Sequence, residues 1–208
     1  MFGDRRAAGR QLAQALLRYA GTNPVVLGLP RGGVPVAAEV ARTLDGTLDV
    51  WVARKLGVPI QPELGMGAIA EGPAVFLDRS TVALVGVTRA QLLEVARREM
   101  TEIRRRVERF RGARTPPDLR DRTVILVDDG IATGGTMKAA VRAVKKRRPA
   151  RLIVAIPVAA PDIVAEFRAM VDDVVCLHQP AALWYEDFRQ VRDDEVVRIL
   201  ERARHDGP

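Results

Sequence analysis

The sequence is poor in the residues and segments that define several common classes of protein. It contains one cysteine, Cys176, and two histidines, so a disulfide framework is excluded, and neither histidine is placed to activate a catalytic thiol. Cys176 is most simply a buried residue at the end of a strand. No apolar run approaches the roughly 18 residues of a membrane span, and the charged N-terminal segment lacks the pattern of a secretion signal. We therefore expect a cytoplasmic protein without a membrane partner.

Positive charge is in excess, with 33 Lys and Arg residues against 26 Asp and Glu residues and a formal net charge of +7. This excess suits a polyanionic partner such as a phosphate ester or nucleic acid. No helix-turn-helix or aromatic RNA-binding pattern is present. Many arginines lie within residues 88–112, where they alternate with Glu94, Glu99, Glu102 and Glu108, which favours a solvated helix face over a nucleic-acid surface.

Alternating apolar segments predict an α/β fold with a mostly parallel central sheet flanked by helices. The runs "VVLGL", "VWVARK", "TVILVDD", "RLIVAIPVA" and "VDDVVCL" indicate strands, and segments with helical spacing separate them. At 208 residues the chain fits a single domain, with its core in residues 1–55 and 120–178. A long helix is predicted over residues 88–112, where Thr88 and Gln91 have capping-box spacing. Residues 179–208 indicate an irregular cap and a terminal helix.

Residues 56–78 interrupt this alternation, with three prolines and several glycines. The segments "GMGAIA" and "AVFLD" are candidate arms of a hairpin that turns at "EGP". The first half, residues 56–65, predicts a mobile loop, because long irregular connections inside compact domains are often functional.

The most specific segment is "TVILVDDGIATGGT", residues 123–136. It places Asp128 and Asp129 at the carboxyl end of a predicted parallel strand, where open α/β sheets bind ligands. The glycines that follow let backbone N–H groups approach an anion, and the next helix points its positive end there. The alternative is a helix-capping loop with two solvated aspartates. We expect a phosphate cradle made by Ala132, Thr133, Gly134, Gly135 and Thr136.

This segment resembles the phosphoribosyl pyrophosphate (PRPP) signature of the type I phosphoribosyltransferases. Nearly the whole chain resembles a group of stand-alone bacterial phosphoribosyltransferase-like proteins. The resemblance implies a flexible loop and a small hood beside the central sheet. It also implies that residues 132–136 hold the ribose 5′-phosphate and that Asp128 and Asp129 lie near the 2′- and 3′-hydroxyls. Mg²⁺ would be held mainly by PRPP, with Asp128 and Asp129 as further candidate ligands.

Two further segments resemble parts of such a site. "GLPRGGVPVA" is similar to the family's pyrophosphate loop, with Arg31, Gly32 and Gly33 supplying a cation and N–H groups. An ordinary strand-to-helix turn is the alternative. The resemblance implies a cis peptide bond entering the glycine, which we expect at Arg31–Gly32. Arg54 and Lys55 end the second predicted strand and are similar to the family's pyrophosphate-binding cations, although a solvated strand terminus would look the same.

Trp184 and Tyr185 fall where the family places the hood over its nucleobase, so either ring is a candidate for base stacking. Packing within the cap's own core explains them nearly as well. The resemblance therefore implies a donor, PRPP, but leaves the small-molecule nitrogen acceptor open. The oligomeric state is also open, a homodimer included.

Two functions follow. The first is a Mg²⁺-dependent phosphoribosyltransferase of nucleotide salvage, with Asp128, Asp129, Arg54 and Lys55 as its catalytic residues. The second is a PRPP-binding regulator without turnover that contacts nucleic acid through the long helix. The predicted loop of residues 56–65 and the adjacent cations Arg54 and Lys55 favour the enzyme.

Overall fold

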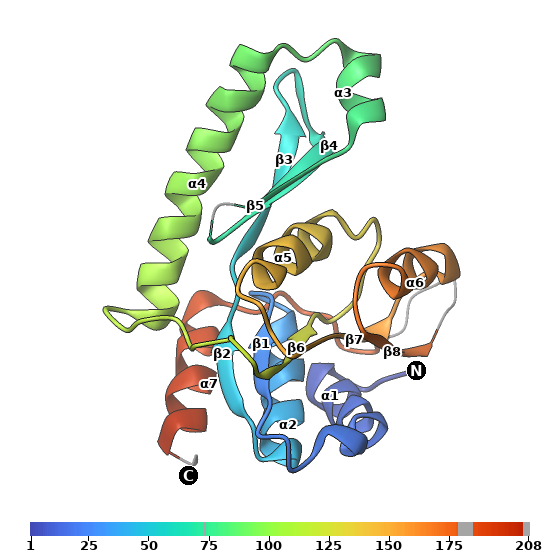
Figure 1. The fold of residues 1–208 in the computed structure, drawn as a ribbon, viewed down its shortest axis with the longest axis vertical. Coiled ribbons are helices and arrows are strands. Elements are labelled where there is room, and N and C mark those ends of the chain that lie inside the picture. Colours follow the sequence, from blue (N-terminus) through green and yellow to red (C-terminus); the bar gives the residue numbers. More distant parts are fainter. Residues whose placement is uncertain (73, 179–184, 206–208) are drawn as a thin grey trace.

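The central sheet has five parallel strands in the order β2-β1-β6-β7-β8 (Figure 1). The computed structural model describes residues 1–72, 74–178 and 185–205. Strands β1 and β6 are buried along their whole length, because helices cover both faces of the sheet. This confirms the predicted fold class. The strand bounds are β1 Val25–Gly28, β2 Thr47–Val50, β6 Thr123–Val127, β7 Arg151–Val158 and β8 Asp173–His178.

The two faces of the sheet carry separate apolar cores, since successive side chains of a strand point to opposite faces. Val26 and Ile125 belong to the core under α1 (Arg5–Ala15), α2 (Gly33–Leu44) and α7 (Asp193–His205). Leu27 and Leu126 belong to the core under α5 (Gly135–Lys145) and α6 (Pro161–Arg168). A short 3₁₀ helix, Leu17–Tyr19, follows α1.

The order of the strands reverses between β1 and β6. Helix α2 leads from β1 outward to β2, whereas α5 leads from β6 outward in the other direction to β7. In open α/β sheets, ligands bind outside the carboxyl ends of the strands at such a reversal. The loops after β1 and β6 are therefore the expected binding loops.

A second sheet of three antiparallel strands, β3 (Ala53–Val58), β4 (Gln61–Ala70) and β5 (Ala74–Leu77), extends away from the first (Figure 1). The predicted β4–β5 hairpin is confirmed. The mobility predicted for residues 56–65 stays a prediction, but the irregular connection is wrong, because these residues form the β3–β4 hairpin. Its pairing shifts register on either side of Gly57, where a Cβ would lie 2.3 Å from Pro62 O. Bulges of this kind place glycine and proline within strands.

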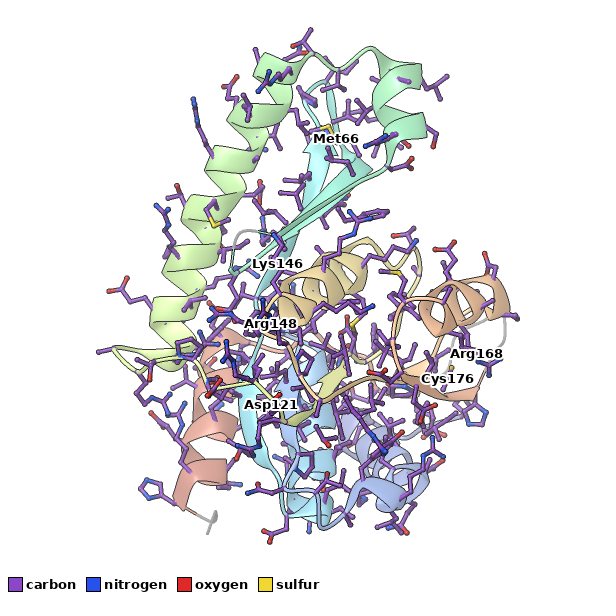
Figure 2. All side chains as sticks on the ribbon, viewed as in Figure 1. Met66, Asp121, Lys146, Arg148, Arg168 and Cys176 are labelled. Carbon is purple, nitrogen blue, oxygen red and sulfur yellow. The ribbon has the colours of Figure 1, made fainter. Side chains whose placement is uncertain are left out.

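Helix α4 (Arg89–Arg111) covers one face of the second sheet, and the short helix α3 (Arg79–Val85) precedes it. Met66, fully buried, lies in this sheet, and Figure 2 marks it together with Cys176, which is half-buried in β8. The predicted capping box between Thr88 and Gln91 is confirmed. The other side of the second sheet packs against α5, so α5 joins the two sheets.

The prediction that the charged residues of α4 form a solvated face is wrong for two of them. Glu99 is 8% exposed and Arg111 is 3% exposed. Arg111 donates to both carboxylate oxygens of Glu71, at 3.0 and 2.9 Å, and to Val50 O at 2.7 Å. It also lies 3.1 Å from Asp49 Oδ2. Arg111 thus ties the end of α4 to β2 and to the β4–β5 turn, a contact that helical spacing does not reveal.

Candidate functional site

The loops after β1 and β6 touch one another at the carboxyl edge of the sheet. Leu29 N donates to Val127 O at 2.8 Å, and Gly33 N donates to Leu29 O at 3.0 Å. A Cβ on Gly32 would lie 2.0 Å from Asp129 Oδ2, and one on Gly33 would lie 2.6 Å from Val127 O. Glycine is therefore required at both positions for this close approach. The structure brings the predicted pyrophosphate loop and the acidic pair together.

The first loop differs from its prediction in two details. The cis peptide bond joins Pro30 to Arg31, one residue before the expected Arg31–Gly32 bond. Gly32 has φ −64° and ψ −34° and caps α2. The N–H of Gly33 is already bonded to Leu29 O. The role of Gly33 is therefore to let the two loops approach closely, and Gly32 is the better candidate to donate its N–H to an anion. Arg31 Nη1 lies 3.6 Å from Asp193 Oδ1 at the start of α7.

The acidic pair is held by neighbours from distant parts of the chain. Asp129 N donates to Asp128 Oδ1 at 2.9 Å. Arg5 Nε lies 2.7 Å from Asp129 Oδ2, and the Tyr185 hydroxyl donates to Asp129 O at 2.6 Å. Burial, followed by the charge of Asp129, raises the pKa of Asp128 well above its ordinary value. Asp128 is thus buried beside a second carboxylate, and that second carboxylate faces Arg5.

Arg5 is the main site residue that sequence reasoning missed. Its guanidinium carbon lies 4.0 Å from the centre of the Phe188 ring, and Nη1 donates to Arg189 O at 2.7 Å. The preceding Asp4 caps α1 and is the residue type that marks a helix start. That signal places Arg5 in a first turn, but nothing in the sequence places this turn beside residue 129.

The loop of residues 132–136 leads into the N-terminus of α5, with Ala132 and Thr133 exposed and Gly135 and Thr136 partly buried. Gly134 has a φ of 73°, a conformation that favours glycine, and no side chain caps the helix. The first helical N–H to find an acceptor is that of Lys138, which donates to Gly134 O at 2.8 Å. The N–H groups before it are therefore available to an anion. The assignment of the ribose 5′-phosphate to Ala132, Thr133, Gly134, Gly135 and Thr136 stays a prediction.

Arg54 and Lys55 lie inside β3 and not at the end of a strand, because the predicted second strand divides into β2 and β3. Arg54 Nε donates to the buried Glu99 Oε2 at 2.9 Å. Lys55 Nζ donates across the hairpin to Glu63 O at 2.8 Å. Among the contacts of the described residues, neither cation reaches the acidic pair. Their contact with pyrophosphate stays a prediction.

The two candidates for base stacking have different outcomes. Trp184 lies outside the described residues. The ring of Tyr185 stacks on Phe188, with centroids 4.9 Å apart, and tilts against Phe2 at 5.5 Å. Burial raises the pKa of its hydroxyl, which binds Asp129 O. Tyr185 therefore packs between Phe2 and Phe188, and its hydroxyl holds the backbone of Asp129.

Two adjacent carboxylates such as Asp128 and Asp129 suit Mg²⁺, which takes one or two carboxylates together with substrate phosphates and water. No group of three or more His, Cys, Asp or Glu side chains that could hold a metal occurs within residues 1–72, 74–178 and 185–205. Within the same residues, every helix is too short or too polar to cross a membrane.

Comparison with known proteins gives a consistent group of matches. A family model described as "Phosphoribosyl transferase domain" matches residues 4–195. A Mycobacterium tuberculosis protein named "Putative phosphoribosyl transferase" is 47% identical over 211 residues, which cover 99% of this chain and 48% of that protein. The chain thus spans about half the length of the curated relatives that it matches over its whole length.

Two further matches differ in extent. The crystal structure of a Thermus thermophilus protein, TT1426, has a TM-score of 0.80 and 44% identity, and the match covers 97% of this chain and 98% of that one. A uracil phosphoribosyltransferase of Lacticaseibacillus paracasei is 41% identical over 59 residues, 28% of each chain.

Proposed function

Because this chain belongs to the phosphoribosyl transferase domain family, we propose that it transfers the 5-phosphoribosyl group of PRPP to a nitrogen acceptor and releases pyrophosphate. One observation carries the proposal. Asp129 Oδ2 occupies the space that a Cβ on Gly32 would need, so the acidic pair and the glycine loop after β1 form one site, which offers carboxylates to sugar hydroxyls and N–H groups to an anion. A phosphorylated sugar with a pyrophosphate group satisfies both.

The chemistry requires the stabilisation of two opposite charges. The bond from C1′ to pyrophosphate breaks with its electrons on the leaving oxygen, and the lone pair of the acceptor nitrogen forms the new bond to C1′. Asp128 and Asp129 would hold the ribose hydroxyls and place negative charge near the cationic sugar. Arg31 and Gly32 N–H would stabilise the departing pyrophosphate, and Asp129 is the candidate base for the acceptor's proton.

Mg²⁺ bound with PRPP would supply positive charge to the pyrophosphate oxygens, and Asp128 and Asp129 are the residues that would contribute oxygen ligands. Arg54 and Lys55 would join the pyrophosphate only after leaving Glu99 and Glu63, with which they now pair. We propose that this exchange accompanies closure of the β3–β4 hairpin over the bound donor.

A turnover assay tests the proposal. The protein is incubated with PRPP, Mg²⁺ and a panel of purine and pyrimidine bases, and pyrophosphate release and base consumption are measured together. Uracil belongs on the panel because one partial relative is a uracil phosphoribosyltransferase. We expect one base of the panel to be consumed, and the amount of pyrophosphate released to equal the amount of that base consumed. Saturable PRPP binding without turnover on any acceptor would instead support a PRPP-binding regulator. The structure offers little support for its contact with nucleic acid through α4, because several charges of this helix are paired or buried.

Replacement of Gly135 by alanine separates ligand approach from stability. A Cβ at this position meets no atom within 4 Å, so the variant should fold normally and gain up to about 1 kcal/mol from a less flexible unfolded chain. The methyl group would nevertheless stand where a phosphate must approach the N–H groups of α5. We expect PRPP affinity to fall by about tenfold, equivalent to one lost charge-assisted hydrogen bond, as measured by calorimetric titration.

Gly3→Ala is the matched control, because a Cβ there also meets no atom within 4 Å. This variant should bind PRPP as tightly as the parent protein does. A Gly135→Ala protein with unchanged PRPP affinity would show that no phosphate approaches the start of α5.

A further inference from the structure

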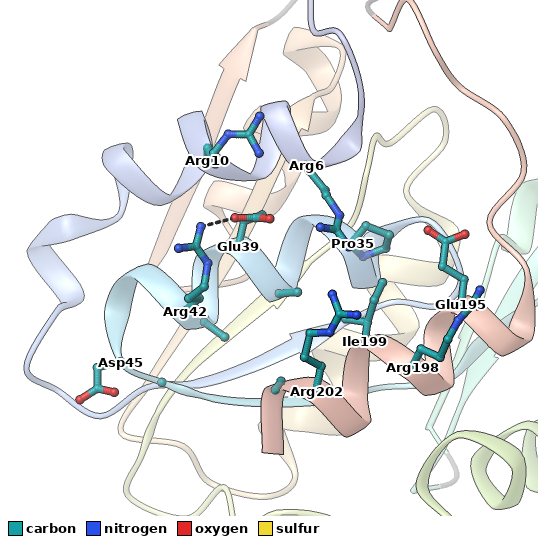
Figure 3. Close-up of a pocket in the computed structure, with 14 residues that line it drawn as sticks. Arg6, Arg10, Pro35, Glu39, Arg42, Asp45, Glu195, Arg198, Ile199 and Arg202 are labelled. Carbon is teal, nitrogen blue, oxygen red and sulfur yellow. Dashed lines mark hydrogen bonds and ion pairs between the residues drawn. The ribbon is translucent and has the colours of Figure 1, made fainter. Parts of the chain in front are cut away.

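A basic groove runs along the outer side of α2, away from the loops of the candidate site. Its volume is about 710 Å³, and α1 and α7 form its two walls. We name it the α2 groove. Figure 3 shows Arg6 on α1 and Arg202 on α7 pointing toward one another across α2. Cavities of several hundred Å³ are of the size that binds small molecules.

Positive charge exceeds negative charge in the lining of the α2 groove. Five arginines and three carboxylates line it. Two of these arginines are paired, Arg42 with Glu39 and Arg198 with Asp194. In the described part of the chain, the other three have no acidic partner. The two remaining carboxylates lie toward opposite ends of the groove (Figure 3). The three unpaired arginines are Arg6, Arg10 and Arg202.

The floor of the α2 groove is apolar, with Pro35, Ala38 and Ala41 from α2 and Ile199 and Ala203 from α7. Guanidinium groups bind phosphate oxygens in a bidentate manner and stack on planar rings. A ligand that uses both surfaces needs at least two anionic groups and a flat, weakly polar part. We propose that the α2 groove is a binding site for a nucleoside di- or triphosphate, with its phosphates at the unpaired arginines and its base over the apolar floor.

The position of the groove couples it to the candidate site. Each of its three helices begins at a residue that contacts that site. Arg5 opens α1 and pairs with Asp129. Gly33 opens α2 and packs against Val127. Asp193 opens α7 and faces Arg31. A nucleotide that draws α1 and α7 together would therefore change the geometry of the acidic pair and of Arg31, so it would act as an effector of PRPP binding.

Equilibrium dialysis with ATP and GTP, with inorganic triphosphate and adenosine as partial probes, tests the site. The variant Arg10→Gln/Arg202→Gln removes two unpaired charges from the groove. The control Arg104→Gln/Arg120→Gln removes two exposed arginines that also have no acidic partner among the described residues and lie outside it. We expect at least one nucleotide to bind to the parent protein and adenosine to bind far more weakly. The groove variant should lose about tenfold or more in affinity, and the control less than about twofold.

Several results would overturn the proposal. The first is an equal loss of affinity in both variants, and the second is adenosine that binds as tightly as ATP. The third is a nucleotide that PRPP displaces completely and that binds to the groove variant as tightly as to the parent protein, because it would then occupy the PRPP site. Light scattering that shows a dimer dissociated by the groove variant would assign the groove to a second copy of the chain instead. The effector role predicts that the nucleotide changes PRPP affinity in the parent and not in the groove variant. Nucleotide binding is measured without any acceptor, so a failed turnover assay leaves this result interpretable.

Discussion

Asp129→Asn is expected to weaken PRPP binding by roughly 100-fold while the fold remains intact. A carboxylate that accepts hydrogen bonds from ribose hydroxyls contributes about 1.5–3 kcal/mol per charged bond, and about 1.4 kcal/mol corresponds to a factor of ten. The amide keeps the size of the side chain but loses the charge and offers a donor in place of one acceptor. The measurement is a calorimetric titration with PRPP and Mg²⁺, accompanied by a thermal unfolding curve.

Asp162→Asn provides the matched control. Asp162 is an exposed acid in the first turn of α6, on the other side of the sheet from Arg5. Its replacement removes the same charge and should leave PRPP affinity unchanged. If Asp129→Asn binds PRPP as well as the parent protein does, the sugar does not lie against the acidic pair and the proposed site is misplaced.

The second large effect concerns stability. Arg111→Ala is expected to lower the free energy of unfolding by about 3–5 kcal/mol, the usual result of removing one partner from a buried ion pair. The reason is Glu71, which is 9% exposed and receives two hydrogen bonds from Arg111. Burial already raises the pKa of Glu71, although Arg111 opposes this shift. Without Arg111, the carboxylate would be buried and unpaired. Chemical denaturation monitored by circular dichroism measures the loss.

Arg104→Ala serves as the control on the same helix, since Arg104 is exposed, and should change the free energy of unfolding by less than about 0.5 kcal/mol. The double variant Arg111→Ala/Glu71→Gln should recover part of the loss, because it removes the unpaired charge. A decrease below about 1 kcal/mol for Arg111→Ala would mean that this buried network contributes little to holding α4 in place.

The central sheet and its binding loops follow from local sequence. "TVILVDDGIATGGT" contains a buried strand, the acids that follow it and the glycines before the next helix, and all three lie where the sequence predicts. The capping box of Thr88 and Gln91 is equally local. These features are determined by neighbouring residues, so the spacing of residue types is sufficient to predict them.

The pairing of charges was not predictable in the same way. Arg5 and Asp129 come from opposite parts of the sequence, and only the packing of α1 beside the sheet brings them together. Arg54 pairs with Glu99, which was expected in solvent and is buried. An arginine or glutamate has the same appearance in a sequence whether it is buried or exposed. Its partner depends on tertiary packing, and hydrophobic periodicity does not record that partner.

The contact between Gly32 and Asp129 has a consequence for the history of this sequence. The Asp129 carboxylate fills the space in which any side chain at position 32 would begin. A substitution at position 32 would therefore have to be accompanied by a smaller or displaced residue at position 129, which would remove the carboxylate from its place beside Asp128 and Arg5. We therefore expect glycine at position 32 and aspartate at position 129 to occur together in related sequences. A relative that has replaced one of the two residues is expected to have replaced the other as well.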